Sequence, residues 1–232
     1  MFDAIIQCRM SSKRLPGKSM LTLKNKPLFY RVYQHAKQSK KLDKIIIATS
    51  NEKSDFPIID FCIKNNIPHF AGSLHDVALR FIKLSKAFSL KNIVRITGDD
   101  PIISGKLIDF GIQNFIDNNL QYFNAIMGET IADGLGFEIF RLNALEKIYK
   151  DGLSDFEKEH VSINLKKTIN SKLIGTFNFK INHPIYSPNI KLCVDTLEDY
   201  IFLYKIFEKF YDGIVDAEKV VKYLVKQKKQ KF

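Results

Sequence analysis

Residues 9–18 of the chain hold four cations, two hydroxyl groups and a Pro-Gly turn immediately after the apolar run 4–6. A loop of this kind can bind a triphosphate, because backbone N–H groups and fixed Arg or Lys side chains surround its oxygens. A solvated basic loop is the alternative interpretation. The position favours phosphate, since open α/β sheets bind ligands beyond the carboxyl ends of their strands. The candidate nucleotide-binding residues here are Arg9, Ser11, Ser12, Arg14 and Lys18.

Carboxylates follow two further apolar runs and could hold a metal ion. Asp99 and Asp100 come after residues 92–97, and Asp195 comes after residues 189–194. If both runs are strands of the same sheet, their ends lie at the edge that carries the basic loop. Hard oxygen ligands beside a triphosphate suit Mg²⁺, so Asp99 and Asp195 are the expected metal ligands. The alternatives are a simple Gly-Asp turn at Asp99 and a helix N-cap at Asp195.

Three weaker segments carry residues that could contact a substrate. Ser73 and Asp76, at a strand-to-helix corner, could reach a base or ribose, although they also make a reasonable helix cap. Asp133 and Glu138 place carboxylates in and after a glycine-containing turn. His160 could contact an anionic substrate or transfer a proton, with a solvated surface as the alternative.

An ATPase or GTPase is the weaker of the phosphate-binding hypotheses. The Walker A pattern requires a glycine where Ser12 stands. Residues 19–24 alternate like a short strand, whereas a Walker lysine such as Lys18 should open a helix. No strand ends in a Walker B carboxylate.

Composition bounds the class of protein. The 232 residues, 45% of them apolar, predict one globular domain with a substantial core. No run of 18 apolar residues and no export signal is found, so we expect a cytoplasmic protein without a membrane span. The net charge of +11 makes nucleic-acid binding a hypothesis to consider, but the lysines are dispersed and no nucleic-acid-binding motif appears. A polyanionic small substrate explains the charge equally well.

The cysteines and histidines predict neither a disulfide framework nor a zinc site. Cys8, Cys62 and Cys193 stand far apart and match no metal or disulfide spacing. The five histidines form no metal-ligand pair at helical spacing. We therefore expect the cysteines to be small core residues.

Alternating short apolar runs and amphipathic stretches predict the architecture of the first half. Strands are expected at residues 4–7, 44–49 and 92–97, with helices at 28–38, 56–65, 77–88 and 106–117. This β-α-β-α order implies an α/β fold with a doubly wound parallel sheet and right-handed crossovers.

From about residue 120 the pattern changes. Strands are expected at 121–125, 136–141, 172–179 and 189–194, and helices at 142–149, 157–169, 197–211 and 217–225. The polar tail 226–231 is expected to fray. No linker rich in Gly, Pro or Ser divides the chain, so we expect residues 1–232 to form a single domain with an inserted β-rich lobe at residues 120–190.

Taken in order, these motifs resemble the SpsF-like cytidylyltransferases of surface-polysaccharide pathways, and behind them the CMP-Kdo and CMP-sialic acid synthetases. The similarity runs through residues 6–18, 47–50, 72–73, 95–99, 133–135, 159–161 and 194–199. It covers nearly the whole chain. The first and last of these motifs are specific when they occur together.

The resemblance implies a Rossmann-like nucleotidyltransferase fold of the glycosyltransferase-A type. It implies that Arg9 and Lys18 bind the triphosphate of CTP, that Asp99 and Asp195 hold Mg²⁺, and that these four residues are catalytic. The Ser73 to Asp76 corner would lie near the nucleoside. A small anionic acceptor, either an acidic keto-sugar or a phosphate or phosphonate, then attacks the α-phosphorus, which releases pyrophosphate and yields a CMP-linked product.

The resemblance further implies a homodimer formed through the 120–190 lobe. This lobe would also bind the acceptor, with Asp133, Glu138 and His160 as the acceptor-binding residues. An alternative function is that of a nucleotidyltransferase that uses another nucleoside triphosphate with a sugar 1-phosphate. So does a nucleotide-sugar-dependent glycosyltransferase of similar fold, although such enzymes more often show an Asp-x-Asp metal motif, a spacing that Asp99-Asp100 lacks.

Overall fold

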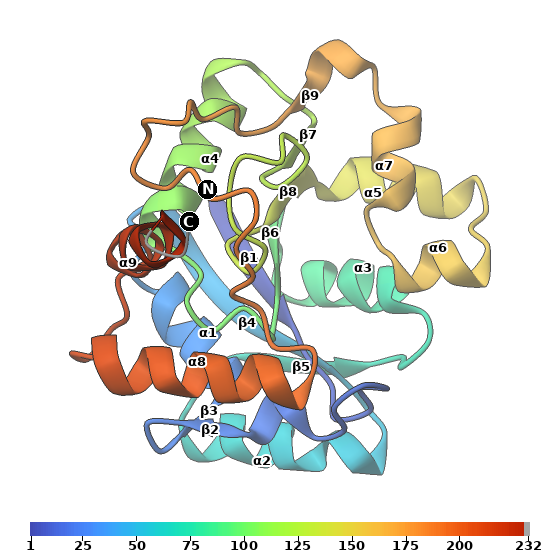
Figure 1. Ribbon diagram of the computed structural model, residues 1–232. Helices are drawn as coiled ribbons and strands as arrows, with labels where there is room; N and C mark the ends of the chain where they lie inside the picture. The colour runs from blue at the N-terminus through green and yellow to red at the C-terminus, as the bar shows by residue number, and fades with distance from the viewer. Residues whose placement is uncertain (230–232) are drawn as a thin grey trace.

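A seven-stranded, mostly parallel sheet forms the centre of the computed structural model, which describes residues 1–229 (Figure 1). The strand order is β5 (His69–Gly72), β4 (Leu42–Ser50), β1 (Phe2–Gln7), β6 (Asn92–Thr97), β8 (Glu138–Arg141), β7 (Tyr122–Asn124) and β9 (Ile174–Gly175). The first four strands are parallel, β8 runs antiparallel to β6 and β7, and β9 is parallel to β7. The fold is therefore an α/β fold built on a Rossmann-like, mostly parallel sheet, as the sequence predicts.

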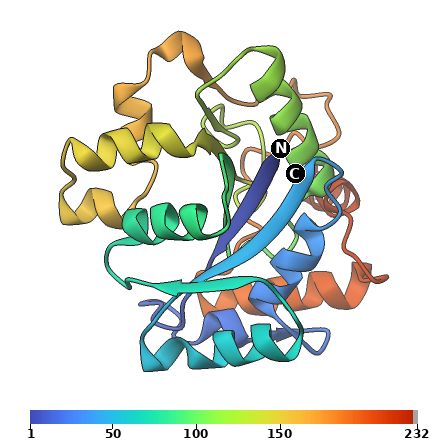
Figure 2. The same cartoon turned by 180° about the vertical axis from the view of Figure 1, so that it is seen from behind.

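Continuous apolar runs form the central strands because both faces of the sheet are covered. Ile6 belongs to the hydrophobic cluster on one face, and Ile5 belongs to the cluster on the other. The Ile6 face packs against α1 (Leu28–Ala36), α4 (Gly105–Asp117) and α8 (Leu197–Phe210), whereas the Ile5 face packs against α3 (Val77–Ala87) and α5 (Leu142–Lys150). Figure 2 shows α3 and α5 on the opposite side of the sheet from α1 and α4.

The remaining elements are short or lie at the periphery. They are the 3₁₀ turns η1 (Lys18–Met20), η2 (Lys53–Asp55) and η3 (Ser171–Leu173), the hairpin of β2 (Thr22–Leu23) and β3 (Lys26–Pro27), and the helices α2 (Phe56–Lys64), α6 (Asp155–Glu159), α7 (Ile163–Thr168) and α9 (Ala217–Lys229). Within residues 1–229, no helix combines the length and the apolar character that crossing a membrane requires.

The second half of the chain departs from the sequence prediction at two strands. Of the expected strand 172–179, only the two residues of β9 pair in the sheet. The expected strand 189–194 is irregular, because its backbone bonds to two loops: Leu192 N–H donates to Asp133 O at 2.6 Å, and Val194 N–H donates to Asp99 O at 2.9 Å. That prediction was therefore wrong in its secondary structure, although the segment does reach the carboxyl edge of the sheet.

Two helical predictions also need correction. The expected helix 157–169 is broken into α6 and α7, because Ser162 lies between them and buries its hydroxyl against Glu138, to which it donates a 2.6 Å hydrogen bond. The basic tail does not fray at residue 226, since α9 continues through Lys229. Residues 230 and 231 of that tail lie outside the described residues.

Candidate functional site

The basic loop after β1 is closed by hydrogen bonds to its own backbone. The carbonyl oxygen of Met10 accepts from the N–H groups of Ser12 and Gly17, at 2.9 and 2.8 Å. Gly17 has a φ of +77°, a left-handed conformation that glycine adopts without strain. The Ser19 hydroxyl donates to the carbonyl of Arg9 at 2.9 Å. The loop is therefore a defined turn that presents its cations from a fixed backbone.

A buried aspartate ties this loop to the neighbouring strand. Oδ1 of Asp55 accepts from the Met10 N–H at 2.7 Å, and its Oδ2 accepts from the Thr49 hydroxyl at 3.0 Å and the Ser50 N–H at 3.1 Å. Charge-assisted bonds of this kind are stronger than neutral ones. Asp55 is thus a positioning residue, and nothing in its local sequence indicated that role.

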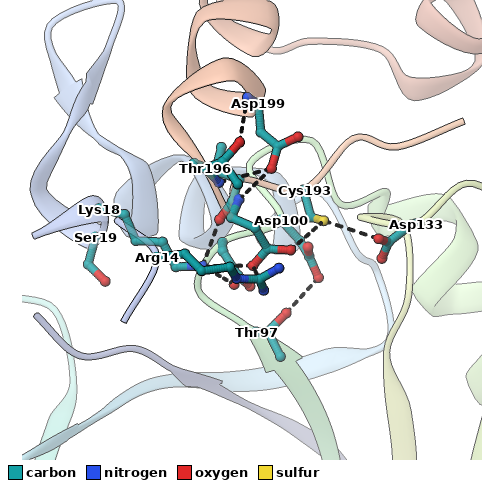
Figure 3. Close-up of polar contacts among 12 residues, drawn as sticks. Arg14, Lys18, Ser19, Thr97, Asp100, Asp133, Cys193, Thr196 and Asp199 are labelled. Atoms are coloured by element: carbon teal, nitrogen blue, oxygen red, sulfur yellow. Dashed lines mark hydrogen bonds and ion pairs between the residues drawn. The ribbon is translucent and has the colours of Figure 1, made fainter. Parts of the chain in front are cut away.

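The acids that follow the two later apolar runs meet at the Lys18 ammonium group, and Figure 3 labels Lys18 close to Arg14. Lys18 Nζ donates to Asp99 Oδ2 at 2.6 Å, to Val194 O at 2.6 Å and to Asp195 Oδ1 at 3.2 Å. Arg14 adds an ion pair to Asp195 Oδ1 at 2.7 Å. Burial works to raise the pKa of Asp195, but Lys18 and its neighbouring cations hold it below its usual value. Lys191 Nζ lies 3.3 Å from Asp195 Oδ2, so two acids and three cations meet at this point of the sheet edge.

Asp195 does not serve as a helix N-cap. Thr196 caps α8 instead: its hydroxyl accepts from the Asp199 N–H at 3.3 Å, and the Asp199 carboxylate accepts from the Thr196 N–H at 3.0 Å. This reciprocal pair is a capping box. The Asp195 side chain is consequently left to face Lys18 and Arg14.

A cavity of about 610 Å³ opens beside the basic loop. Its cations are Arg9, Lys13, Arg14, Lys18, Arg80 and Arg95, and its apolar and aromatic wall includes Val77, Phe156 and His160. Cations from several elements facing one cavity attract a polyanion and strengthen its binding. The size and charge of this cavity suit a nucleoside triphosphate.

A second cavity of about 300 Å³ adjoins the first. Both are lined by Arg95, Thr97, Asp99 and Asp195. Asp100, Asn124, Asp133, Glu138 and Cys193 line only the smaller one. The two acids that contact Lys18 therefore lie where the cavities meet.

Glu138 holds Arg95 at the boundary between the cavities. Its carboxylate pairs with the Arg95 guanidinium and accepts from the Tyr122 hydroxyl and from Ser162 Oγ, the latter at 2.6 Å. Burial works to raise the pKa of Glu138, but Arg95 and the two hydroxyl donors outweigh it and lower the pKa. Arg95 also donates to Gln7 Oε1 at 3.0 Å. Because Glu138 is 9% exposed and fully engaged, it positions Arg95.

Asp133 is the exposed carboxylate of the smaller cavity. Its Oδ2 accepts from the Cys193 thiol at 3.3 Å. Burial raises the pKa of Cys193, so the thiol stays protonated and acts as a donor. Burial, and then the nearby Asp99, raise the pKa of Asp100 well above its usual value. Asp100 also accepts from the Thr97 hydroxyl at 2.7 Å.

The structure does not group all of the predicted acceptor residues together. Asp133 and Glu138 line the smaller cavity, whereas His160 lines the larger one, with its ring centroid 4.4 Å from that of Phe156. On the nucleotide side, Arg9, Ser12, Arg14 and Lys18 line the larger cavity and Ser11 is exposed outside its lining.

Ser73 and Asp76 form the helix cap that the sequence offered as their alternative role. Ser73 Oγ accepts from the Asp76 N–H at 2.9 Å, and Asp76 Oδ1 accepts from the Leu79 N–H at 2.8 Å. Asp76 Oδ2 accepts from the Tyr149 hydroxyl at 2.9 Å. From this corner it is Val77 and Arg80 that line the cavity.

Sequence reasoning missed several cavity residues. Lys13 lies inside the predicted loop, and Arg95 is a charge within an otherwise apolar strand, a signal that could have been used. Glu159 pairs with Arg9 at 2.9 Å across 150 residues of sequence, and no local pattern indicated that contact.

Asp99 and Asp195 fit the requirements of a magnesium site. Mg²⁺ takes one or two protein carboxylates and completes its shell with water and phosphate oxygens. The two acids already converge on one cation, Lys18. Within residues 1–229, no group of three or more His, Cys, Asp or Glu side chains is arranged to hold a metal ion, so such an ion would depend on oxygens from the nucleotide.

Comparison with known proteins identifies the family. The cytidylyltransferase family model matches residues 4–230. An uncharacterised protein of Methanocaldococcus jannaschii is 36% identical over 96% of this chain and 89% of its own length. The spore coat polysaccharide biosynthesis protein SpsF of Bacillus subtilis is 32% identical over 88% of this chain and 85% of its own length.

A solved structure agrees with these relatives. A cytidylyltransferase from Leptospira borgpetersenii superposes with a TM-score of 0.89 and is 26% identical, over 99% of this chain and 95% of that one. The fold and the sequence therefore support the same family. The chain belongs to the cytidylyltransferase family.

Proposed function

We propose that this protein transfers CMP from CTP to an acceptor held in the smaller cavity, with release of pyrophosphate. The observation that carries the proposal is the contact of Lys18 with both Asp99 and Asp195 where the two cavities meet. A reaction between two substrates requires such a junction, because the attacking and transferred groups must lie next to each other.

The cations of the larger cavity bind and orient the triphosphate. Arg9, Lys13 and Arg14 project from a loop whose backbone is fixed by Met10 and Asp55, so they meet the phosphates with little reorganisation. Arg9 exchanges its contact with Glu159 for a phosphate oxygen. Lys18 stabilises the charge that develops on the leaving pyrophosphate.

Asp99 and Asp195 would hold Mg²⁺, the cofactor we propose. The bound ion would supply charge neutralisation at the α-phosphate. In this arrangement Lys18 gives up part of its contact with the two acids and turns to the phosphates. Until the nucleotide arrives, the two acids stay paired with Lys18 and Arg14.

The acceptor binds in the smaller cavity, and we propose that it carries one anionic group. Arg95 is the cation shared by both cavities, and Glu138 fixes its position. An acceptor anion would pair with Arg95, and its hydroxyl groups would donate to Asp133. By analogy with SpsF we propose a role in surface-polysaccharide biosynthesis, and a homodimer formed through residues 120–190.

A pyrophosphate-release screen tests the proposal. Each of the four nucleoside triphosphates is incubated with Mg²⁺ and a panel of acidic keto-sugars, sugar phosphates and phosphonates. We expect release with CTP and at least one acceptor, and none when the acceptor is left out. Release with UTP or GTP but not with CTP would instead favour a nucleotidyltransferase of different donor specificity.

A further inference from the structure

Asp133 differs from the other acids of the smaller cavity. Five acids line this cavity, and four of them are paired with a cation or buried: Asp99, Asp100, Glu138 and Asp195. The fifth, Asp133, is exposed and forms no ion pair within residues 1–229. Its Oδ2 accepts from the Cys193 thiol, whereas its Oδ1 has no hydrogen-bond partner among the same residues. One oxygen of this carboxylate is therefore available to a substrate in the cavity.

The backbone around Asp133 is fixed by a neighbouring segment of the chain. Asp133 N–H donates to Ile190 O at 3.0 Å, and its carbonyl accepts from the Leu192 N–H at 2.6 Å. Gly134 has a φ of +97°, and a Cβ atom there would lie 2.3 Å from the carbonyl carbon of Leu192. Glycine therefore allows the two segments to lie this close. The Cys193 thiol then orients the Asp133 carboxylate (Figure 3), so the side chain is in place before a substrate binds.

The same thiol links Asp133 to the acid at the junction of the two cavities. Cys193 Sγ lies 3.3 Å from Asp133 Oδ2 and 3.8 Å from Asp195 Oδ2, so a single sulfur atom separates the two carboxylates. The proposed function places the α-phosphate beside Asp195. A hydroxyl oxygen about 3 Å from Asp133 and about 3–3.5 Å from that phosphorus fits between the two acids. Asp133 therefore lies where a base that activates the attacking group is required.

We infer that Asp133 is the general base that takes the proton from the attacking hydroxyl group of the acceptor; this rests on the proposed function. The hydroxyl gives its proton to Asp133 Oδ1 while its oxygen forms a bond to the α-phosphorus. The bond from that phosphorus to the oxygen that bridges to the β-phosphate breaks, and its electron pair leaves with pyrophosphate. The proton then passes to solvent, to which the Asp133 side chain is exposed.

The charges of the smaller cavity favour a hydroxyl over a phosphate as the attacking group. The cavity is lined by five acids and by a single cation, Arg95. Acids around an attacking phosphate dianion would repel it. A phosphate is also ionised at neutral pH and needs no base, whereas a sugar hydroxyl must lose its proton when it attacks. The one anionic group of the acceptor then pairs with Arg95, and a separate hydroxyl group reacts at Asp133.

Kinetics of two Asp133 variants test this assignment. Turnover is measured with CTP, Mg²⁺ and whichever acidic keto-sugar, sugar phosphate or phosphonate gives the fastest pyrophosphate release with the unmodified protein. We expect Asp133→Asn to lower kcat about 100- to 10,000-fold, the usual contribution of a general base, and to leave the affinity for CTP unchanged. Glu129→Gln is the matched control, because Glu129 is an exposed acid of the same β7–β8 connection and lines neither cavity.

Chemical rescue distinguishes a base from a residue that only shapes the cavity. In Asp133→Ala, added formate can occupy the space of the missing carboxylate and accept the proton. We expect kcat of Asp133→Ala to rise with formate concentration, and kcat of Asp133→Asn to stay low, because its amide fills the same space.

Other outcomes would overturn the assignment. A raised acceptor KM with unchanged kcat in Asp133→Asn would make Asp133 a binding contact only. A loss of kcat in Asp133→Ala that formate does not reverse would make its role structural. If Asp133→Ala does not fold, the division of the Asp133→Asn effect between kcat and acceptor KM decides. Failure of the proposed function would show separately, as no pyrophosphate release from CTP by the unmodified protein with any acceptor of the panel.

Discussion

The two cavities are built by regions that differ in how directly sequence sets structure. The larger cavity is lined mainly by residues 7–99, which follow regular parallel strands, together with a few residues from α6 and Asp195. The smaller cavity draws on residues 124–138 and 193–195, where the strands are short and the chain is largely irregular. The first region presents charges from fixed strand ends, whereas the second holds its side chains through hydrogen bonds between distant segments.

The largest effect is expected where the two regions meet. Asp99→Asn and Asp195→Asn each remove a charge from the point that both cavities share, so turnover should fall below detection while the fold is retained. Steady-state pyrophosphate release measures the loss, and circular dichroism confirms folding. A folded variant with full Mg²⁺-dependent activity would contradict the assignment of that acid.

The next effect tests whether the smaller cavity depends on its buried network. Glu138→Gln leaves the Arg95 charge without a partner, and breaking such a buried pair costs about 3–5 kcal/mol of unfolding free energy. Urea denaturation measures the change. Tyr122→Phe, which removes one donor to the same carboxylate, is the milder control. A Glu138→Gln loss no larger than that of Tyr122→Phe would show that Glu138 does not organise this region.

The ionisation of Glu138 predicts that the stability of the protein depends on pH. The pKa of Glu138 is lower in the folded protein than its reference value of 4.5, so its contribution to stability is present above pH 4.5. That contribution is lost as the pH falls through the folded pKa. The acid limb of the stability profile should therefore flatten in Glu138→Gln. An unchanged acid limb would mean that groups other than Glu138 determine the loss of stability at low pH.

Charge removal in the larger cavity is expected to weaken nucleotide binding. Arg9→Ala and Lys18→Ala should each weaken CTP binding by about 1.5–3 kcal/mol, because a charge-assisted contact is lost. Calorimetric titration measures the change, and Lys83→Met, which removes an exposed cation from α3, serves as the surface control. Unchanged affinity in both variants would mean that residues 9–18 are a solvated basic loop.

The smallest effect is expected at His160 and tests which of the two substrates this residue contacts. Its place beside Phe156 in the larger cavity predicts that His160→Ala weakens CTP binding about two- to tenfold, through lost aromatic contact, and spares the acceptor KM. A raised acceptor KM with unchanged CTP affinity would show that His160 contacts the acceptor, as the sequence predicts.

The sequence predicts best what periodicity and strand ends determine. The parallel strands β1, β4 and β6 and the helices around them were predicted, whereas β5 was not. Asp99, Asp195 and Lys18 were chosen because strand ends meet at one edge of the sheet, although the segment before Asp195 is not a strand. Glu138 and Arg95 could not be placed in this way. Their roles depend on burial and on their pairing with each other across 43 residues of sequence.

The secondary structure of the irregular segments was predicted wrongly for a related reason. Residues 189–194 have the composition of a strand, yet their backbone bonds go to the loops at Asp133 and Asp99. Alternation along one segment does not reveal which neighbour supplies its hydrogen bonds. The homodimer and the acceptor's identity stay predictions for the same reason, since both depend on surfaces that local patterns do not describe.

The structure of the complex with CTP and Mg²⁺ tests the central claim most directly, namely that the donor occupies the larger cavity and reacts where it meets the smaller one. We predict the triphosphate on Arg9, Arg14 and Lys18, the α-phosphate beside Asp99 and Asp195, and the smaller cavity left open to the acceptor. A nucleotide bound among Asn124, Asp133 and Glu138, with Asp99 and Asp195 still paired to Lys18, would contradict the account.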